Sequence, residues 1–266
     1  MNKPHRARKR FGQNFLHDQG VIHRIVSAIG PTADQHLVEI GPGQGALTAD
    51  LVDSGCRLDV VELDRDLVPA LEERFGATPR FRLHSADALR FDYASLAEDK
   101  QPLRLVGNLP YNISTPLIFH LLGFAEHIDD MHFMLQKEVA QRLAAEPGSK
   151  SWGRLGVMAQ YWCKVEILFD VAPGAFRPAP KVTSAIVRLK PKPIAPDEGL
   201  EVRLKKVVTA AFSQRRKTLR NTLRDLIDVQ QLESLGISPT ARAETLTLEQ
   251  FVQLSDLISP DPGQQE

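Results

Sequence analysis

The repeated alternation of short apolar segments with helix-period stretches constrains the fold of this chain more than any other feature. Residues 37–40 and 58–63 are short runs rich in branched aliphatic side chains, which predict buried strands. Each is followed by a stretch with helical spacing, at residues 46–54 and 66–75. The same analysis predicts strands at 81–83, 103–106 and 131–135 and a helix at 115–122. This alternation is typical of a doubly wound parallel sheet, so we expect a Rossmann-like α/β fold.

The pattern changes in the second half of the chain. Residues 165–171 and 182–189 are extended runs joined by a proline-rich segment too short to hold a crossover helix, and we expect them to form an antiparallel hairpin at the sheet edge. Residues 191–196 (PKPIAP) cannot continue a strand and predict a linker.

Helical periodicity returns beyond this linker, at residues 200–227 and 247–258. We therefore expect two domains. Residues 1–192 would form the α/β domain with a basic N-terminal arm, and residues 197–266 a small, all-helical C-terminal domain.

Charge is segregated along the chain although the formal net charge is zero. Residues 1–10 carry five basic side chains and no acid, and residues 150–224 carry 16 basic and 5 acidic side chains. A single run of this kind is usually a solvated surface, but two basic blocks in an otherwise acidic chain favour a polyanionic partner such as nucleic acid.

Two further features of the composition limit the class of protein. No apolar run approaches the roughly 20 residues that a membrane span needs. The two cysteines, Cys56 and Cys163, lie far apart, which argues against a zinc site or a disulfide framework. We expect a cytoplasmic protein with neither a metal ion nor a membrane partner.

A glycine-rich loop at residues 39–46 (EIGPGQGA) follows the first predicted strand and precedes a helix. Glycines at this position let the backbone turn sharply and approach a ligand closely, which makes Gly41 and Gly43 candidate cofactor contacts. The loop also fits the dinucleotide pattern G-x-G-x-x-A, so an NAD-dependent enzyme is one alternative. Glu39, an acid within the strand, favours a different cofactor, because dinucleotide enzymes usually keep an apolar residue there.

Polar side chains end the next three predicted strands. These residues fit a methyl donor that contains a nucleoside. Glu62 would suit its ribose, Asp87 would suit its adenine amine, and Asn108 lies where its reactive end is expected. Ligands bind at the carboxyl ends of the strands in such sheets. For Glu62 and Asp87 the alternative role, capping of a strand end, stays open.

The segment Asn108-Leu109-Pro110-Tyr111 is the sharpest motif in the chain. Adenine N6 is a poor nucleophile and needs two acceptors for its hydrogens, which the Asn108 side-chain oxygen and the Leu109 carbonyl would supply. Pro110 fixes the turn, and Tyr111 offers a ring on which an unstacked base can lie. A plain Asn-x-Pro-Tyr turn is the alternative, but the glycine loop upstream favours catalysis.

Phe176, in the proline-rich hairpin loop, is a second candidate for stacking on the base, opposite Tyr111. The alternative is that this aromatic side chain packs the loop onto the core.

Several motifs together are similar to those of the small-subunit ribosomal RNA adenine N6,N6-dimethyltransferases of bacteria. The resemblance covers roughly residues 8 to 258 and rests on the segments 10–16 (RFGQNFL), 38–43 (VEIGPG), 61–65 (VELDR), 87–88 (DA), 107–114 (GNLPYNIS), 134–138 (MLQKE), 176–182 (FRPAPKV) and 214–221 (QRRKTLRN).

This resemblance implies a methyl donor, S-adenosylmethionine, bound by Asn14, Leu16, Gly41, Glu62, Asp87 and Asn108. It implies as substrate two adjacent adenosines in a hairpin near the 3′ end of small-subunit (16S) rRNA, each methylated twice, within an assembling 30S particle. We expect no obligate protein partner. The basic side chains expected to bind RNA phosphates are Arg6, Arg8, Lys9, Arg10, Arg215, Arg216, Lys217 and Arg220.

Two alternative functions remain open on the same fold. One is a large-subunit rRNA adenine methyltransferase of the macrolide-resistance type, which shares the glycine loop and the Asn-x-Pro-Tyr motif. The other is a ribosome-assembly or nucleic-acid-binding factor without turnover.

Overall fold

The computed structural model describes residues 14–97, 101–193 and 199–259. Within these ranges the chain forms two compact units. The first extends to Ala140 and resumes at Lys164–Pro191, and the second takes Gln141–Cys163 and the residues from Lys192 onward.

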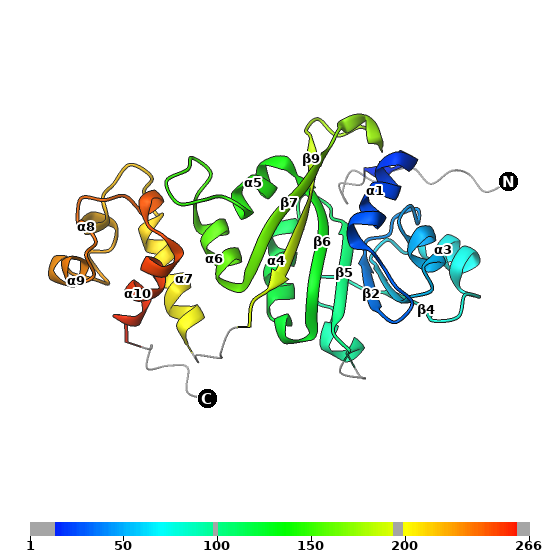
Figure 1. Ribbon diagram of the computed structural model, residues 1–266, viewed down its shortest axis with the longest axis horizontal. Coiled ribbons are helices and arrows are strands. Elements are labelled where there is room, and N and C mark those ends of the chain that lie inside the picture. The colour runs from blue at the N-terminus through cyan, green and yellow to red at the C-terminus, as the bar shows by residue number, and fades with distance from the viewer. Residues whose placement is uncertain (1–13, 98–100, 194–198, 260–266) are drawn as a thin grey trace. The chain divides into compact units, whose positions relative to one another are not determined.

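The described part of the first unit is built on a seven-stranded sheet (Figure 1). Its strand order is β4-β3-β2-β5-β6-β9-β7. The strands β2 to β6 are mutually parallel, and β9 runs antiparallel to β6. The bounds are β2 (His36–Ile40), β3 (Arg57–Glu62), β4 (Phe81–Ser85), β5 (Leu103–Asn108), β6 (Ile128–Gln136), β7 (Cys163–Val171) and β9 (Ser184–Pro191). The predicted Rossmann-like, doubly wound sheet with β7 and β9 at one edge is confirmed.

The helices of this unit connect the strands at the expected places. They are α1 (Gln19–Ile29), α2 (Thr48–Asp53), α3 (Val68–Phe75), α4 (Ser114–Leu122) and α5 (Lys137–Leu143), which continues into the second unit. Helix α1 shows why these segments are helical. Asp18 caps its N-terminus by accepting a hydrogen bond from the Val21 nitrogen, and Gly30 ends it in the left-handed conformation.

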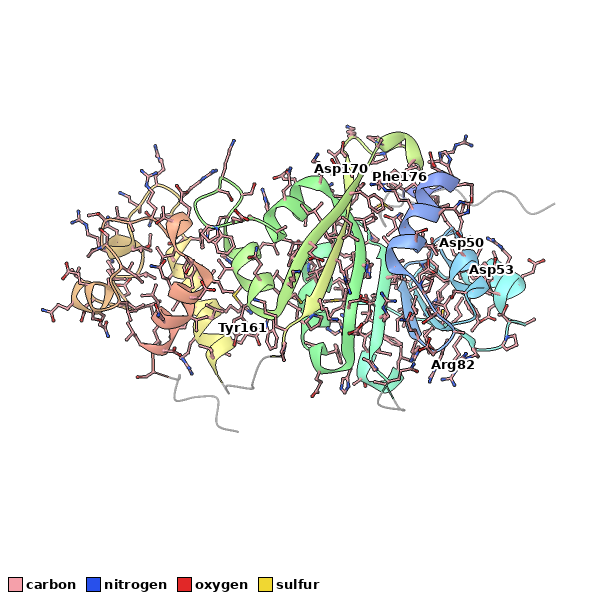
Figure 2. The ribbon with its side chains drawn as sticks, viewed as in Figure 1. Asp50, Asp53, Arg82, Tyr161, Asp170 and Phe176 are labelled. Carbon is pink, nitrogen blue, oxygen red and sulfur yellow. The ribbon has the colours of Figure 1, made fainter. Side chains whose placement is uncertain are left out.

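A separate two-stranded sheet pairs the N-terminal segment with the hairpin loop. Strand β1 (Phe15–Leu16) is antiparallel to β8 (Phe176–Arg177), with Leu16 opposite Phe176 and Phe15 opposite Arg177. Leu16 and Phe176 are both buried in one apolar cluster with side chains of α1, beside which Figure 2 places Phe176. The pair therefore fixes residues 15–16 against the core.

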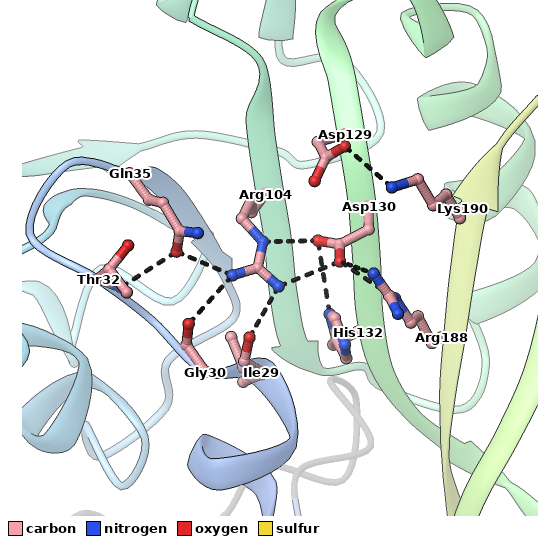
Figure 3. A network of polar contacts seen from close by, with 10 residues as sticks. All are labelled: Ile29, Gly30, Thr32, Gln35, Arg104, Asp129, Asp130, His132, Arg188 and Lys190. Carbon is pink, nitrogen blue, oxygen red and sulfur yellow. Dashed lines mark hydrogen bonds and ion pairs between the residues drawn. The ribbon is translucent and has the colours of Figure 1, made fainter. Parts of the chain in front are cut away.

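A buried ionic network ties α1 to the central strands (Figure 3). Arg104 of β5 donates to Asp130 of β6 at 2.8 Å and 3.1 Å and to the Ile29 carbonyl oxygen at 2.8 Å. Arg188 of β9 donates to the same carboxylate at 3.0 Å and 3.2 Å. Burial opposes ionisation of Asp130, but the hydrogen bonds from Arg104 and the nearby positive charges lower its pKa overall. The carboxylate thus stays ionised with no exposure to solvent.

The second unit is helical over the residues that the structure describes. Its helices are α6 (Arg154–Trp162), α7 (Leu200–Ala211), α8 (Leu219–Thr222), α9 (Val229–Ser234) and α10 (Leu248–Asp256). Helices α9 and α10 both begin with a capping box, formed by Asp228 with Gln231 and by Thr247 with Gln250.

The observed division differs from the predicted domains, 1–192 and 197–266, in its placement of residues 141–163. Trp152 and Val157, from this segment, are buried in the same cluster as Leu204 and Leu254 of the C-terminal helices. The Trp152 ring nitrogen also donates to the Leu246 carbonyl oxygen at 2.9 Å. Packing across a large sequence separation, which local periodicity does not report, thus decides where this segment belongs.

The helical period predicted across residues 200–227 is interrupted. Helix α7 ends at Ala211, and a turn at residues 212–218 precedes the short helix α8. The first nitrogens of α8 find partners outside the helix, because Leu219 and Arg220 donate to the carbonyl oxygens of Ala241 and Pro239. These long-range bonds favour a new helix start over the continuation of α7.

Candidate active site

A cavity of about 330 Å³ lies at the carboxyl ends of β2, β3 and β5 in the first unit. The chain leaves β2 toward β3 and β4 on one side and returns to β5 and β6 on the other, so the strand order reverses between β2 and β5. Open α/β sheets bind ligands at such a switch point. The volume lies within the range of small-molecule sites.

The structure brings all the predicted methyl-donor residues together around this cavity. Its lining includes Asn14, Leu16, Gly41, Gly43, Glu62, Asp87 and Asn108, and also Leu109, Pro110 and Tyr111. These residues come from segments far apart in the sequence.

The glycine loop turns between β2 and α2 in the left-handed region. Gly41 has φ 65° and Gly43 has φ 60°, conformations that residues with a Cβ rarely adopt. A Cβ on Gly43 would also lie only 3.1 Å from the Phe15 ring. A side chain at this position would therefore strain the backbone and press on the Phe15 ring.

Glu62, at the end of β3, is held by backbone donors. Its carboxylate accepts hydrogen bonds from the Gly43 nitrogen at 3.2 Å and the Asp64 nitrogen at 2.8 Å. Burial raises the pKa of this carboxyl group. A buried carboxylate fixed at a cavity wall is suited to accept from ligand hydroxyl groups.

Glu39 lies deeper, in β2, and only 1% of it is exposed. Burial, with a further contribution from the Glu62 charge, raises the pKa of Glu39 to about 7, although the Thr48 hydroxyl donates to it at 2.6 Å. Asp87, after β4, is fixed by a hydrogen bond from the Leu89 nitrogen at 3.0 Å. With Glu62 and Asp64, the cavity is lined by four carboxyl groups.

Asn108, the last residue of β5, is oriented by its side-chain nitrogen. This nitrogen donates to the backbone oxygen of Asn14 at 3.0 Å. Since the donor end of the amide is engaged, the oxygen is the end that can accept from an amine in the cavity.

Tyr111 is held by its hydroxyl group, at the end of the side chain. Its hydroxyl group shares a hydrogen bond of 2.7 Å with the hydroxyl group of Ser184. Ser184 is fully buried and begins β9, where it is paired with Gln136 of β6. The orientation of the Tyr111 ring is therefore set by the sheet as well as by its own loop.

Phe176 does not take the predicted position opposite Tyr111. Only 2% of Phe176 is exposed, and the cavity lining, as the structure describes it, does not include this residue. In an antiparallel pair, directly opposite residues share a face and successive residues alternate. Phe176 is opposite Leu16, and both are buried in the same apolar cluster, so the geometry matches the packing alternative.

The basic residues predicted to bind RNA are only partly described. Arg6, Arg8, Lys9 and Arg10 lie outside the described residues. Arg215, Arg216 and Lys217 are exposed in the turn between α7 and α8, within the segment predicted to be helical, and Arg220 is exposed on α8. Each of these four side chains is accessible to a phosphate.

Three residues around the site have no role in the sequence analysis. Phe15 packs against the glycine loop, Leu63 is 49% exposed at the cavity wall, and Ser184 holds Tyr111. Leu63 could have been identified from local sequence, because it directly follows the candidate residue Glu62. Phe15 and Ser184 act through long-range pairings that local sequence does not report.

A family model described as ribosomal RNA adenine dimethylase matches residues 4–259 of this chain. The chain belongs to this family. It is 61% identical over 260 residues to ribosomal RNA small subunit methyltransferase A of Pseudomonas aeruginosa, covering 97% of both chains. It is 60% identical to the protein of the same name from Hahella chejuensis, covering 100% of this chain and 97% of that one.

Two solved structures have the same fold as this chain. The 23S rRNA methyltransferase ErmE superposes with a TM-score of 0.73 at 26% identity, covering 92% of this chain and 99% of that chain. A dimethyladenosine transferase from Plasmodium falciparum gives a TM-score of 0.76 at 24% identity, covering 90% of this chain and 95% of that one. The second likeness is evidence for the fold alone.

Two negative findings apply to the described residues only. Among them, no group of histidine, cysteine or acidic side chains is arranged to hold a metal ion. None of their helices combines the length and the apolar character needed to cross a bilayer.

Proposed function

We propose that this protein transfers methyl groups from S-adenosylmethionine to N6 of two adjacent adenosines in a hairpin near the 3′ end of small-subunit rRNA, giving N6,N6-dimethyladenosine. The observation that carries the proposal is the orientation of Asn108. Its amide is anchored on Asn14 within a cavity that also holds the other predicted donor residues.

The cavity suits S-adenosylmethionine in its small-molecule volume and its charge. Four carboxyl groups favour a ligand with a positively charged sulfonium and ammonium group. Glu62 would accept from the ribose hydroxyl groups, and Asp87 from the adenine amine of the donor. Asn14, Leu16, Gly41 and Gly43 would contact the rest of the molecule. The bound donor supplies an electrophilic methyl group, and no metal ion is needed.

The residues of this chain would act mainly by positioning the target amine. The Asn108 side-chain oxygen and the Leu109 carbonyl would accept its two hydrogens and turn its lone pair toward the methyl group. Pro110 fixes the backbone between these acceptors and Tyr111, whose ring would support the extrahelical base. Phe176, buried here with Leu16, would take part only if the hairpin loop changed its packing.

The comparisons favour small-subunit over large-subunit rRNA as the substrate. Identity is 61% to a small-subunit enzyme of nearly equal length and 26% to the 23S rRNA methyltransferase ErmE. The turn that carries Arg215, Arg216 and Lys217, together with the N-terminal arm, would bind phosphates of the rRNA. The substrate would be an assembling 30S particle in the cytoplasm, and no obligate protein partner would be needed. The C-terminal domain, predicted from residue 197 on, would contribute much of this contact.

The proposal is tested by offering labelled S-adenosylmethionine with unmethylated small subunits and, separately, with large-subunit RNA. We expect N6,N6-dimethyladenosine in the small-subunit rRNA alone. Label in large-subunit RNA would transfer the assignment to the resistance enzymes. Tight binding of small subunits without any label would favour the assembly factor without turnover.

A further inference from the structure

The mouth of the cavity raises an electrostatic problem for an RNA substrate. Glu62, Asp64 and Asp87 line the cavity together with Glu39, which is only partly ionised at neutral pH, and the carboxylates repel a phosphate backbone that approaches them. An enzyme that draws a single nucleotide toward such a cavity requires positive charge at its rim. The predicted basic residues of the described chain, Arg215 to Arg220, all belong to the second unit.

The β1–β8 pair supplies a positive charge in the first unit. Phe15 and Arg177 are directly opposite one another, so their side chains share one face of the pair. The other face carries Leu16 and Phe176, which are buried in one apolar cluster, and Leu16 also lines the cavity. Phe15 lines the cavity and lies against Gly43. Arg177 is therefore directly opposite a residue that lines the cavity, although the lining, as far as the structure describes it, does not include Arg177 itself.

Arg177 is exposed and accessible to a ligand. Within the residues that the structure describes, no carboxylate forms an ion pair with it and no acceptor binds its guanidinium group. Asp170, the acid next to the end of β7, is paired with Lys137. A guanidinium group in this state can form two parallel hydrogen bonds to one phosphate.

We propose that Arg177 binds a phosphate of the RNA strand at the mouth of the cavity, beside the adenosine to be methylated. This inference rests on the proposed function and extends it, because it places an RNA contact on the catalytic unit itself. The contact would hold the backbone on one side of the target nucleotide while the base enters the cavity toward Asn108. Like other phosphate contacts, it would add affinity and register without base specificity.

The test compares Arg177→Gln and Arg177→Lys with wild type in binding to unmethylated small subunits at several salt concentrations. We expect Arg177→Gln to bind about tenfold more weakly at low salt, as for one lost charge-assisted hydrogen bond. The slope of log affinity against log salt should fall by about 0.7 to 0.9, the value for one phosphate. Arg177→Lys, which keeps the charge, should keep most of the slope.

Arg82→Gln is the matched control. Arg82 is an exposed arginine of the same unit, on β4, and Figure 2 shows it at the opposite side of the unit from Phe176, the neighbour of Arg177. It should leave both affinity and slope unchanged. An Arg177→Gln variant with the wild-type slope, or one that weakens S-adenosylmethionine binding instead, would overturn the inference.

Failure of the proposed function gives a different result. Methyl transfer by the wild-type protein is measured on the same small subunits. If the wild type methylates them and Arg177→Gln keeps the salt slope, the inference about Arg177 alone is wrong. If the wild type neither binds nor methylates them, both the function and the inference are wrong.

Discussion

The side-chain nitrogen of Asn108 donates to the backbone oxygen of Asn14 at 3.0 Å, across 94 positions of the sequence. This contact joins the end of β5 to the segment that leads into β1. Because a backbone oxygen can only accept, the Asn108 amide must present its nitrogen to Asn14 and its oxygen elsewhere. The N-terminal segment thus orients the proposed catalytic side chain as well as lining the cavity.

Asn108→Ala should leave the affinity for S-adenosylmethionine nearly unchanged and lower the rate of methyl transfer by about two orders of magnitude or more. Asn108→Asp is the sharper variant, since it keeps the shape of the side chain but replaces the donor with a second acceptor facing Asn14. We expect it to lose most of the activity as well. Single-turnover transfer to unmethylated small subunits measures both. An active Asn108→Asp enzyme would show that the Asn14 contact does not orient the residue.

The bond between Tyr111 and Ser184 should matter for catalysis through the orientation of the ring. Ser184→Ala and Tyr111→Phe each remove this hydrogen bond but keep the aromatic face. Each should lower kcat by about 3- to 10-fold, the effect of one lost hydrogen bond, with a smaller change in KM.

The double variant tests whether the two hydroxyl groups act as a pair. Because both single changes remove the same interaction, the double variant should be no slower than either single variant. Losses that multiply would mean that the two side chains act independently. The melting temperature of each variant shows whether a loss of activity reflects unfolding.

Local sequence predicts the parts of the site that lie at the ends of strands. Gly41, Glu62 and Asn108 follow segments rich in branched apolar residues, Asp87 follows the shorter predicted strand at 81–83, and parallel strands bring their carboxyl ends to one edge of the sheet. Topology alone therefore gathers these residues around one cavity, and neighbouring positions along the chain are enough to identify them.

The parts that local sequence does not predict depend on pairing between distant segments. Whether Phe176 enters the cavity is decided by its register with Leu16, and a shift of one residue would exchange the faces of Phe176 and Arg177. Trp152 likewise joins the C-terminal helices through a core that forms only in the folded chain. In both cases the sequence shows that the side chain is apolar, but it does not show which distant residue the side chain packs against.

Glu39 should make the stability of the donor-free protein depend on pH. The pKa of this group is about 7 in the folded protein, above its ordinary value of 4.5. The folded state therefore binds this proton more tightly than the unfolded chain. Its contribution to stability is complete below about pH 4.5 and is lost as the pH rises through 7.

Glu39→Gln, which stays neutral, should remove this dependence. Between pH 5 and pH 8.5, wild type should lose on the order of 2 to 3 kcal/mol more unfolding free energy than the variant. Urea unfolding at the two pH values measures the difference. Glu73→Gln, a change at an exposed carboxyl group of α3, is the control and should behave as wild type. Equal losses in wild type and Glu39→Gln would contradict the assigned shift.

The network around Asp130 should support the fold without affecting the site. Asp130→Asn removes the negative charge that compensates Arg104, whose side chain is only 10% exposed, and Arg188. Breaking a buried ion pair in this way typically costs about 3 to 5 kcal/mol of unfolding free energy. Because the pKa of Asp130 is lowered, the network is complete above the ordinary value of 3.8 and is lost as the pH falls below it. The variant should therefore differ most from wild type near neutral pH.

Arg104 is the second residue of β5 and Asn108 is the last, so the network lies at the end of the strand away from the cavity. At temperatures where Asp130→Asn is folded, its affinity for S-adenosylmethionine should equal that of wild type. Asp53→Asn, at an exposed position of α2, should change the unfolding free energy by no more than about 0.5 kcal/mol. Weaker donor binding by a folded Asp130→Asn protein would show that the network also shapes the cavity, through the strand that joins them.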